Sequence, residues 1–194
     1  MRTICFCLSA ALLVPSTALA DDDAKSAAPA KVEDVRLKDL ILKVPSTWTA
    51  AKSTSTMRLA TYDIPAAKGD AETAELTIFN FGDGGGDVSS NITRWIGQFG
   101  SEGRTSSVLK GKAGDNEYYL ADITGSYNKS VGPPFLQKTE KKDGYRMLGV
   151  ILKLEGKGVY FLKLAGPDAT VKAAADDFRA SFGGSEKSET AYEL

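Results

Sequence analysis

Histidine is absent from the whole chain of 194 residues. Its absence removes the side chain that most often acts as a general base near neutral pH, and also the commonest metal ligand. A Ser-His-Asp or Cys-His catalytic mechanism is therefore excluded, as are zinc sites that use histidine. Carboxylates, lysine and tyrosine can still move protons, so catalysis is disfavoured rather than excluded.

The N-terminal segment has the pattern of a secretory signal peptide. Arg2 supplies the positive charge, residues 4–14 form a short apolar run, and residues 18–20, Ala-Leu-Ala, form a small-residue cleavage site. The apolar run is too short to span a bilayer. We therefore expect residues 1–20 to be removed and the chain to be exported, periplasmic or secreted. The mature chain would begin at Asp21 and would not insert into the membrane.

Cysteine is nearly absent as well. Both cysteines, Cys5 and Cys7, lie inside the N-terminal segment, so the mature chain is expected to contain none. It would then have no disulfide, no thiol nucleophile and no thiolate ligand for a metal.

The chain also has no excess of positive charge, with 24 basic against 25 acidic residues. Nucleic acid and anionic lipid are normally bound by a basic patch, so neither is expected as a partner.

Polar segments flank a region rich in apolar side chains. Residues 21–36 have few large apolar groups to offset the entropy of ordering, so we expect a disordered leader there. Residues 183–194 are expected to form a disordered tail for the same reason. Residues 37–182 are long enough for one domain with a sizeable core, and they contain no internal repeat.

Apolar and β-branched segments within this domain predict about seven strands. These are residues 40–44, 57–64, 75–81, 106–110, 118–127, 145–154 and 159–165. A short glycine-bearing turn joins the last two, which predicts an antiparallel hairpin. The segment 75–81 has apolar side chains on both faces, which predicts an interior strand. Residues 128–144 are predicted to be a long loop.

Two amphipathic helices are predicted to pack on these strands. The first has an apolar stripe formed by Val88, Ile92, Trp95, Ile96 and Phe99. Asp87 occupies its N-cap position, and Gly100 is expected to end it. The second helix is predicted to start near residue 168 and to end at Gly183. Because strands mostly follow strands, we expect an α+β fold with a mostly antiparallel sheet of six to seven strands.

This order of elements resembles the PsbP-like fold, named for an extrinsic subunit of photosystem II, in which an antiparallel sheet lies between helices. The similar features are a first strand that runs into Val-Pro-Ser-Thr-Trp at residues 44–48, a helix after the third strand, and a late hairpin. The hairpin leads into a C-terminal helix that ends in Ala-Ser-Phe at residues 180–182. The chain is also similar to uncharacterised exported bacterial proteins. The resemblance implies a non-catalytic binding or assembly factor.

The stretch from Gly82 to Asp87 looks like a ligand loop but departs from the known motifs. It lacks the third glycine of a dinucleotide fingerprint and the lysine of a P-loop. Asp87 at the start of a helix would also repel a phosphate. We interpret the stretch as a turn with a capping aspartate. A cation site that uses Asp83 and Asp87 is the alternative, although a calcium loop would need more acidic groups.

A stronger candidate for a contact surface lies in the predicted loop. Pro133 and Pro134 hold the backbone extended, and Phe135 and Leu136 add apolar area beside them. We predict that these four residues bind a partner, an unknown protein or a component of the cell envelope. The alternative is that Phe135 and Leu136 cover the sheet as part of the core.

The polar residues that could perform chemistry are spread along the chain. They are Asp63, Glu72, Glu75, Asp122, Tyr127 and Arg146. Arg94, beside the apolar stripe of the first helix, is expected to pair with an acidic group such as Asp63 or Asp122. Two carboxylates that face each other could serve a hydrolase acting on an envelope or extracellular polymer. The sequence favours a non-catalytic, exported binding or assembly module without cofactor or metal, and the hydrolase is the alternative.

Overall fold

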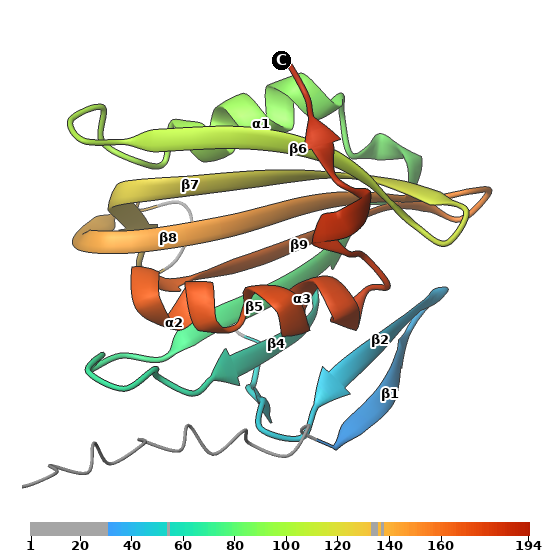
Figure 1. Cartoon of the computed structure of the whole chain (residues 1–194), viewed down its shortest axis with the longest axis horizontal. Helices are drawn as coiled ribbons and strands as arrows, with labels where there is room; N and C mark the ends of the chain where they lie inside the picture. The colour runs from blue at the N-terminus through green and yellow to red at the C-terminus, as the bar shows by residue number, and fades with distance from the viewer. Residues whose placement is uncertain (1–30, 54, 133–135, 137) are drawn as a thin grey trace, which may run out of the picture.

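An antiparallel sheet forms the centre of the fold (Figure 1). The computed structural model describes residues 31–53, 55–132, 136 and 138–194. The predicted signal peptide and most of the predicted leader therefore lie outside the described residues. The strands are β1 (Val32–Leu37), β2 (Leu40–Pro45), β3 (Thr49–Ala50), β4 (Arg58–Ile64), β5 (Ala74–Asn80), β6 (Thr105–Ala113), β7 (Asn116–Ser130), β8 (Thr139–Leu154), β9 (Gly158–Pro167) and β10 (Thr190–Ala191). The helices are α1 (Val88–Ile96), α2 (Asp168–Ala173) and α3 (Ala175–Ser181), with short 3-10 turns η1 (Gly82–Gly84) and η3 (Glu186–Ser188).

In the described part of the chain, eight strands form the sheet in the order β10-β6-β7-β8-β9-β5-β4-β3, and β1 and β2 form a separate hairpin. Every neighbouring pair is antiparallel. The predicted α+β fold is confirmed. The predicted late hairpin is formed by β8 and β9, and β5 is an interior strand between β4 and β9. The strands that the sequence pattern does not predict are β1, β3 and β10.

The sheet carries an apolar core on each face. Successive side chains of a strand point to opposite faces, so β8 supplies Leu148 to one core and Met147 to the other. Helices α2 and α3 cover the first face and lie in front of the sheet in Figure 1, where Phe178 is fully buried. Helix α1 covers part of the second face, where Ile92 and Trp95 pack against the strands.

Helix α1 begins as predicted but ends earlier. The Asp87 carboxylate accepts a hydrogen bond from the backbone N–H of Ser90 at 2.9 Å, which satisfies one of the free donors of the first turn. The helix ends at Ile96, so the predicted end at Gly100 is wrong. Gly100 already lies along β7, because its backbone N–H donates to the carbonyl of Ser126 at 2.9 Å.

Much of the predicted loop at residues 128–144 is strand. β7 continues to Ser130 and β8 starts at Thr139, with Lys129 opposite Glu140 in the ladder. The side chains at these positions are polar, so the strand ends lack the alternating apolar residues by which a strand is recognised in a sequence. Ladder hydrogen bonds join backbone groups, however, and need no apolar side chain at an exposed end of the sheet.

Both ends of the domain are more ordered than predicted. β1 starts at Val32, inside the predicted leader, because it pairs with β2 along its whole length. In the predicted tail, β10 pairs with β6, and Glu189 forms a buried ion pair with Arg179 at 2.8 Å. Tyr192 packs edge-on against Tyr119. Partners distant in sequence order these polar segments, so composition alone is misleading there.

The predicted last helix is divided into α2 and α3 at Ala174. The division is slight, because the backbone N–H of Ala174 still donates to Thr170 at 3.1 Å and its carbonyl accepts from Phe178 at 2.8 Å. The predicted apolar stripe is therefore kept, with Val171 and Phe178 fully buried.

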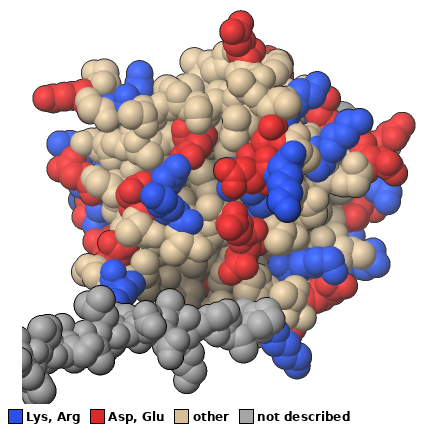
Figure 2. All heavy atoms as spheres, viewed as in Figure 1, with Lys and Arg blue, Asp and Glu red and all other residues tan. Residues whose placement is uncertain are grey.

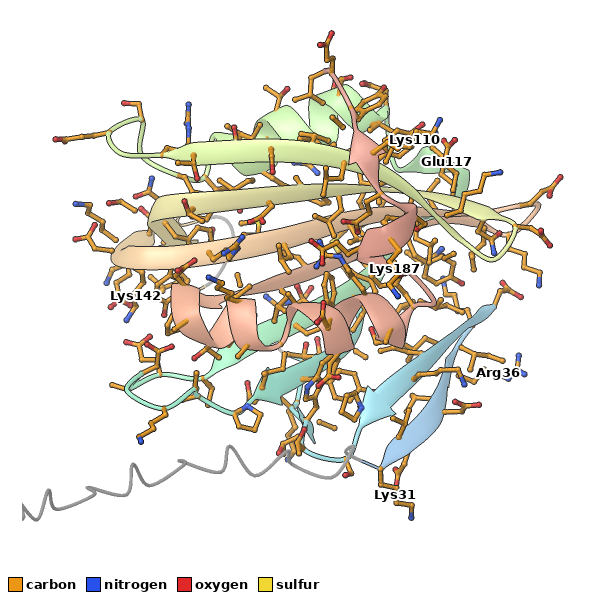
Figure 3. The ribbon with its side chains drawn as sticks, in the orientation of Figure 1. Lys31, Arg36, Lys110, Glu117, Lys142 and Lys187 are labelled. Carbon is orange, nitrogen blue, oxygen red and sulfur yellow. The ribbon has the colours of Figure 1, made fainter. Side chains whose placement is uncertain are left out.

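Charges of both signs are intermixed on the face drawn in Figure 2. Many are paired locally, such as Lys110 on β6 and Glu117 on β7, which lie side by side in Figure 3 with 2.6 Å between the amine and the carboxylate. Lys142 lies 2.9 Å from Glu72 and 3.0 Å from Glu140. None of the helices within the described ranges is long and apolar enough to cross a membrane.

Candidate functional site

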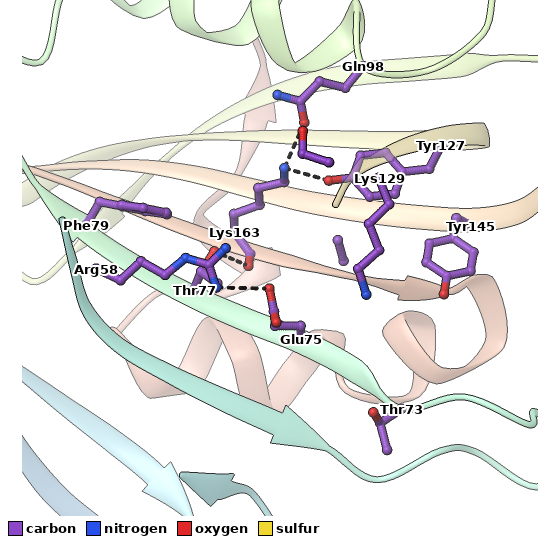
Figure 4. Close-up of a pocket in the computed structure, with 12 residues that line it drawn as sticks. Arg58, Thr73, Glu75, Thr77, Phe79, Gln98, Tyr127, Lys129, Tyr145 and Lys163 are labelled. Carbon is purple, nitrogen blue, oxygen red and sulfur yellow. Dashed lines mark hydrogen bonds and ion pairs between the residues drawn. The ribbon is translucent and has the colours of Figure 1, made fainter. Parts of the chain in front are cut away.

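A hollow of about 200 Å³ lies on the α1 face of the sheet, next to the end of α1 (Figure 4). Strands β4, β5, β7, β8 and β9 all contribute side chains to it, because they are consecutive in the sheet and alternate residues of each point to this face. We call this hollow the lysine hollow. Its charged lining residues are Arg58, Glu75, Lys129 and Lys163.

Lys163 reaches into the lysine hollow from β9. Its neighbours Leu162 and Leu164 point into the core of the opposite face, so the alternation of the strand places Lys163 on the α1 face. Its amine donates to Gln98 Oε1 at 2.7 Å and to the Tyr127 hydroxyl at 2.8 Å (Figure 4). An ammonium group has three N–H donors, so one donor remains for another acceptor.

Burial lowers the pKa of the Lys163 amine to about 8. The negative charge of Glu75 opposes this shift, whereas the positive charges of Arg58 and Arg94 add to it. Burial raises the pKa of Tyr127 to about 12, so the phenol keeps its proton at neutral pH. The hollow thus combines a phenol donor with an amine that loses its charge not far above neutral pH.

Positive charge is in excess in the lysine hollow. Glu75 is the one carboxylate among its lining residues in the described chain, and it lies 3.4 Å from the guanidinium of Arg58. Lys129 and Lys163 remain as additional cations. Within the described ranges, no carboxylate oxygen lies within 4.0 Å of the Lys163 amine. The arrangement is therefore suited to hold an anion beside Lys163.

A second hollow of about 230 Å³ adjoins the first, between α1 and the strands β5 and β9. We call it the aromatic hollow, because its walls come largely from Phe79, Phe81, Trp95 and Phe161. The Phe161 ring lies edge-on to both Phe81 and Trp95, at centroid distances of 5.6 and 6.3 Å. The two hollows share three lining residues, which are Phe79, Gln98 and Lys163.

The glycine loop before α1 lies against the aromatic hollow. A Cβ on Gly85 would lie 2.7 Å from the Phe161 ring, so only glycine lets the backbone pass this close. The buried Asn91 donates to the Gly85 carbonyl at 2.7 Å and accepts from Arg94 at 2.6 Å. The side chain of Asn91 thus connects both the glycine loop and Arg94 to the same turn of α1. The side chain of Asp83 lies outside the described part, and Asp87 serves as the cap of α1.

The predicted ion pair of Arg94 with Asp63 or Asp122 is wrong. Arg94 lines the aromatic hollow and is held by Asn91, three residues earlier on the same helix. The acidic groups lie elsewhere. Asp63 is exposed on β4, and Asp122 binds another arginine.

That arginine is Arg146, which lies outside both hollows. Its guanidinium donates to Asp122 at 2.8 Å and to Asp168 at 3.2 Å, and the hydrogen bond to Asp122 is the main reason that the pKa of Arg146 is raised. Asp168 is the first residue of α2, so the cluster lies on the face opposite the lysine hollow. Arg146 therefore joins α2 to the sheet.

The predicted contact loop falls mostly outside the described residues. This applies to Pro133, Pro134 and Phe135, whereas Leu136 is described and is 59% exposed. A partner surface at these residues stays a prediction. In the described part of the chain, no group of three or more acidic, histidine or cysteine side chains could hold a metal ion.

Two of the predicted catalytic candidates, Glu75 and Tyr127, do meet in the lysine hollow. Glu72 lies outside it and accepts hydrogen bonds from Lys142 and Tyr145. A hydrolase of the kind considered needs two carboxylates roughly 5–10 Å apart in one cleft. Among the described lining residues the hollow offers one carboxylate, so the arrangement does not support this alternative.

The sequence pattern alone does not identify Lys163, Gln98 and Arg58 as site residues. A signal for Lys163 is present, since it is a single charge inside the apolar strand of residues 159–165, at a position that alternates with Phe161 and Ala165. Gln98 and Arg58 give no such signal. Gln98 follows a helix by two residues and Arg58 starts a strand, where polar residues are common.

No family model and no curated protein matches this chain. Among solved structures, cyanobacterial PsbP from Synechocystis is similar over 87% of this chain and 96% of its own, with 13% identity and a TM-score of 0.46. A protein of unknown function from Pseudomonas aeruginosa is similar over 77% of this chain and 92% of its own, with 15% identity and a TM-score of 0.42. The resemblance to the PsbP-like fold expected from the sequence agrees with the first. Both likenesses concern the fold, and neither carries a function to this chain.

Proposed function

We propose that the chain is an exported, non-catalytic binding module whose ligand is a small anion held in the lysine hollow. The observation that carries the proposal is the Lys163 amine, which enters the hollow without a carboxylate partner among the described residues. Export rests on the signal-peptide pattern of residues 1–20.

An anion is the ligand that this charge distribution favours. A charge withdrawn from water is unfavourable unless a counter-charge and hydrogen bonds compensate it. Gln98 and Tyr127 provide hydrogen bonds to Lys163 but no counter-charge. A bound carboxylate would accept the remaining N–H of Lys163 and would supply the missing negative charge, as charge-assisted hydrogen bonds do.

The donor set supports binding rather than proton transfer. Tyr127, with a pKa of about 12, keeps its proton near neutral pH. Glu75 is engaged by Arg58 and is not aligned with a second carboxylate of the hollow. These groups can hold and orient an anion, whereas a proton-transfer mechanism would need a matched acid and base.

The test is calorimetric titration of the folded protein with benzoate and with the neutral analogue benzyl alcohol. We expect benzoate to bind more tightly than benzyl alcohol, and Lys163→Met to weaken benzoate about tenfold or more, as loss of a hydrogen bond to a charged group does. Benzyl alcohol should respond little to this substitution, because it carries no charge.

The matched control is Lys172→Met, which removes an exposed lysine from α2 on the opposite face. It should leave benzoate affinity unchanged. Equal weakening in both variants would indicate a general charge effect and would contradict a site at Lys163. Absence of benzoate binding to the folded wild-type protein would remove the proposal.

A further inference from the structure

The two hollows differ in chemistry on either side of their shared residues. The lysine hollow presents cations and the Tyr127 hydroxyl, whereas the aromatic hollow is lined mainly by aromatic rings, of which Phe81 is the most exposed. Lys163 lines both, and its amine is held by Gln98, which also lines both. A ligand that fills both hollows would therefore need a polar end and an apolar end.

The volumes limit the size of each end. A cavity of about 150 Å³ holds one benzene molecule, so hollows of 200 and 230 Å³ each admit a group of about one ring. The aromatic hollow is also incompletely closed, since Phe81 is 41% exposed although it stacks on Phe79 and meets Phe161 edge-on. A flat apolar body placed there would cover the exposed Phe81 ring.

We infer that the ligand is an amphipathic aromatic carboxylate of about two rings, with its carboxylate at Lys163 and its ring body against Trp95 and Phe161. This inference rests on the proposed function and adds the apolar half of the ligand. The carboxylate oxygens accept hydrogen bonds from the free N–H of Lys163 and from Tyr127 O–H. The rings make edge-to-face contacts of the kind already present between Trp95 and Phe161.

Arg94 adds to this arrangement from the helix side. Its guanidinium lines the aromatic hollow and is fixed by Asn91 at 2.6 Å. A planar cation near the rim favours the electron-rich face of an aromatic ligand. The hollow therefore discriminates between a flat aromatic body and a polar one of equal size.

Trp95 provides a direct readout, because the other tryptophan, Trp48, lies in the core of the opposite face. The experiment measures fluorescence of the full mature chain carrying Trp48→Phe, with Trp95 as its single tryptophan, titrated with 2-naphthoate, benzoate and 2-naphthylmethanol. We expect 2-naphthoate to change the Trp95 emission and to bind about tenfold or more tightly than benzoate, because its second ring is buried. If the Trp48→Phe chain is unfolded by circular dichroism, the same titrations are followed by calorimetry on the wild-type chain.

Two substitutions test the contacts of the carboxylate end and of the ring end of the ligand separately. Lys163→Met should weaken 2-naphthoate and leave 2-naphthylmethanol little changed, whereas Phe81→Ser should weaken both and leave benzoate unchanged. The control for Phe81 is Ile41→Ser, which removes a similarly exposed apolar side chain from the β1–β2 hairpin. Equal affinity for benzoate and 2-naphthoate, with no effect of Phe81→Ser, would overturn the inference and leave the proposed function intact. Failure of both carboxylates to bind the folded protein would overturn both.

Discussion

At the scale of single residues, the candidate site depends on the charge of Lys163. The amine is partly withdrawn from water and has neutral hydrogen-bond partners, so its protonation is more easily changed than that of a surface lysine. Binding of an anion and protonation of this amine are therefore coupled, because each favours the other.

We predict that benzoate affinity falls as the pH rises above about 8. The pKa of Lys163 in the free protein is lowered to about 8, so the amine is charged below that pH and neutral above it. The ammonium is the form that binds a carboxylate, and a bound anion raises the amine pKa. Affinity should thus be constant from about pH 6 to 7 and decline by up to tenfold per pH unit well above 8. Calorimetric titrations across pH 6–10 check this.

Several other titratable or charged groups surround the amine. They are Arg58, Glu75, Arg94, Tyr127, Lys129 and Tyr145. Burial raises the pKa of Tyr145 to about 12, as it does for Tyr127. The Lys163→Met variant should accordingly show a much flatter profile. A wild-type affinity that stays constant up to pH 10 would contradict the assignment to Lys163.

At the scale of elements, the position of α1 decides where the hollows lie. The helix has nine residues and is thus about 14 Å long, whereas eight strands at about 4.8 Å spacing span more than 30 Å. One short helix cannot cover this face, and the part above β4, β5 and β9 stays open. Trp95 anchors the helix over Gly149 of β8, where a Cβ would lie 2.5 Å from the indole.

We predict that Gly149→Ala destabilises the protein by about 1–3 kcal/mol, as overpacking of a core usually does. The added methyl group would force the Trp95 indole, and with it α1, away from the sheet. The measurement is the free energy of unfolding from urea denaturation followed by circular dichroism. Gly84→Ala is the control, because a Cβ there meets no atom within 4 Å and the residue does not need a positive φ. Equal stability of Gly149→Ala and the wild type would show that the helix is not held at this point.

At the scale of the whole molecule, the two faces of the sheet have different roles. The α2 and α3 face is a closed core that includes Phe178 and Leu162, both fully buried. The α1 face combines a smaller core with the two hollows. The stability of the domain therefore rests more on one face, and ligand binding in our proposal uses the other.

At the scale of the whole chain, we predict that the protein is exported and that its mature form begins at Asp21. In a bacterial host, N-terminal sequencing of the exported protein should give Asp-Asp-Asp-Ala. Ala20→Phe should block processing, because cleavage needs a small residue at that position. Ala24→Phe, beyond the cleavage site, is the control and should be processed normally. A chain that keeps Met1 and stays in the cytoplasm would contradict the prediction.

The sequence predicts those elements of the fold whose interactions join residues close together in the chain. The stripe of Ile92, Trp95 and Phe99 predicts α1, and the glycine turn predicts the β8–β9 hairpin, because both signals lie within a few residues. The strand ends near Lys129 and Glu140 are missed, since their order comes from backbone pairing across the sheet. The lysine hollow is missed for a related reason. Lys163 acquires its role only when strand order brings Tyr127 and Glu75 beside it.

The C-terminal segment has a consequence for the timing of folding. β10 pairs with part of the free edge of β6, and Glu189 supplies the counter-charge for the buried Arg179. Both contacts need residues 189–191, which follow β6 and α3 in the sequence and are synthesised after them. Until then the β6 edge is open and Arg179 lacks its partner, so the native state is incomplete. A chain that is still being synthesised therefore stays short of its most stable form until this segment is present and has paired with β6.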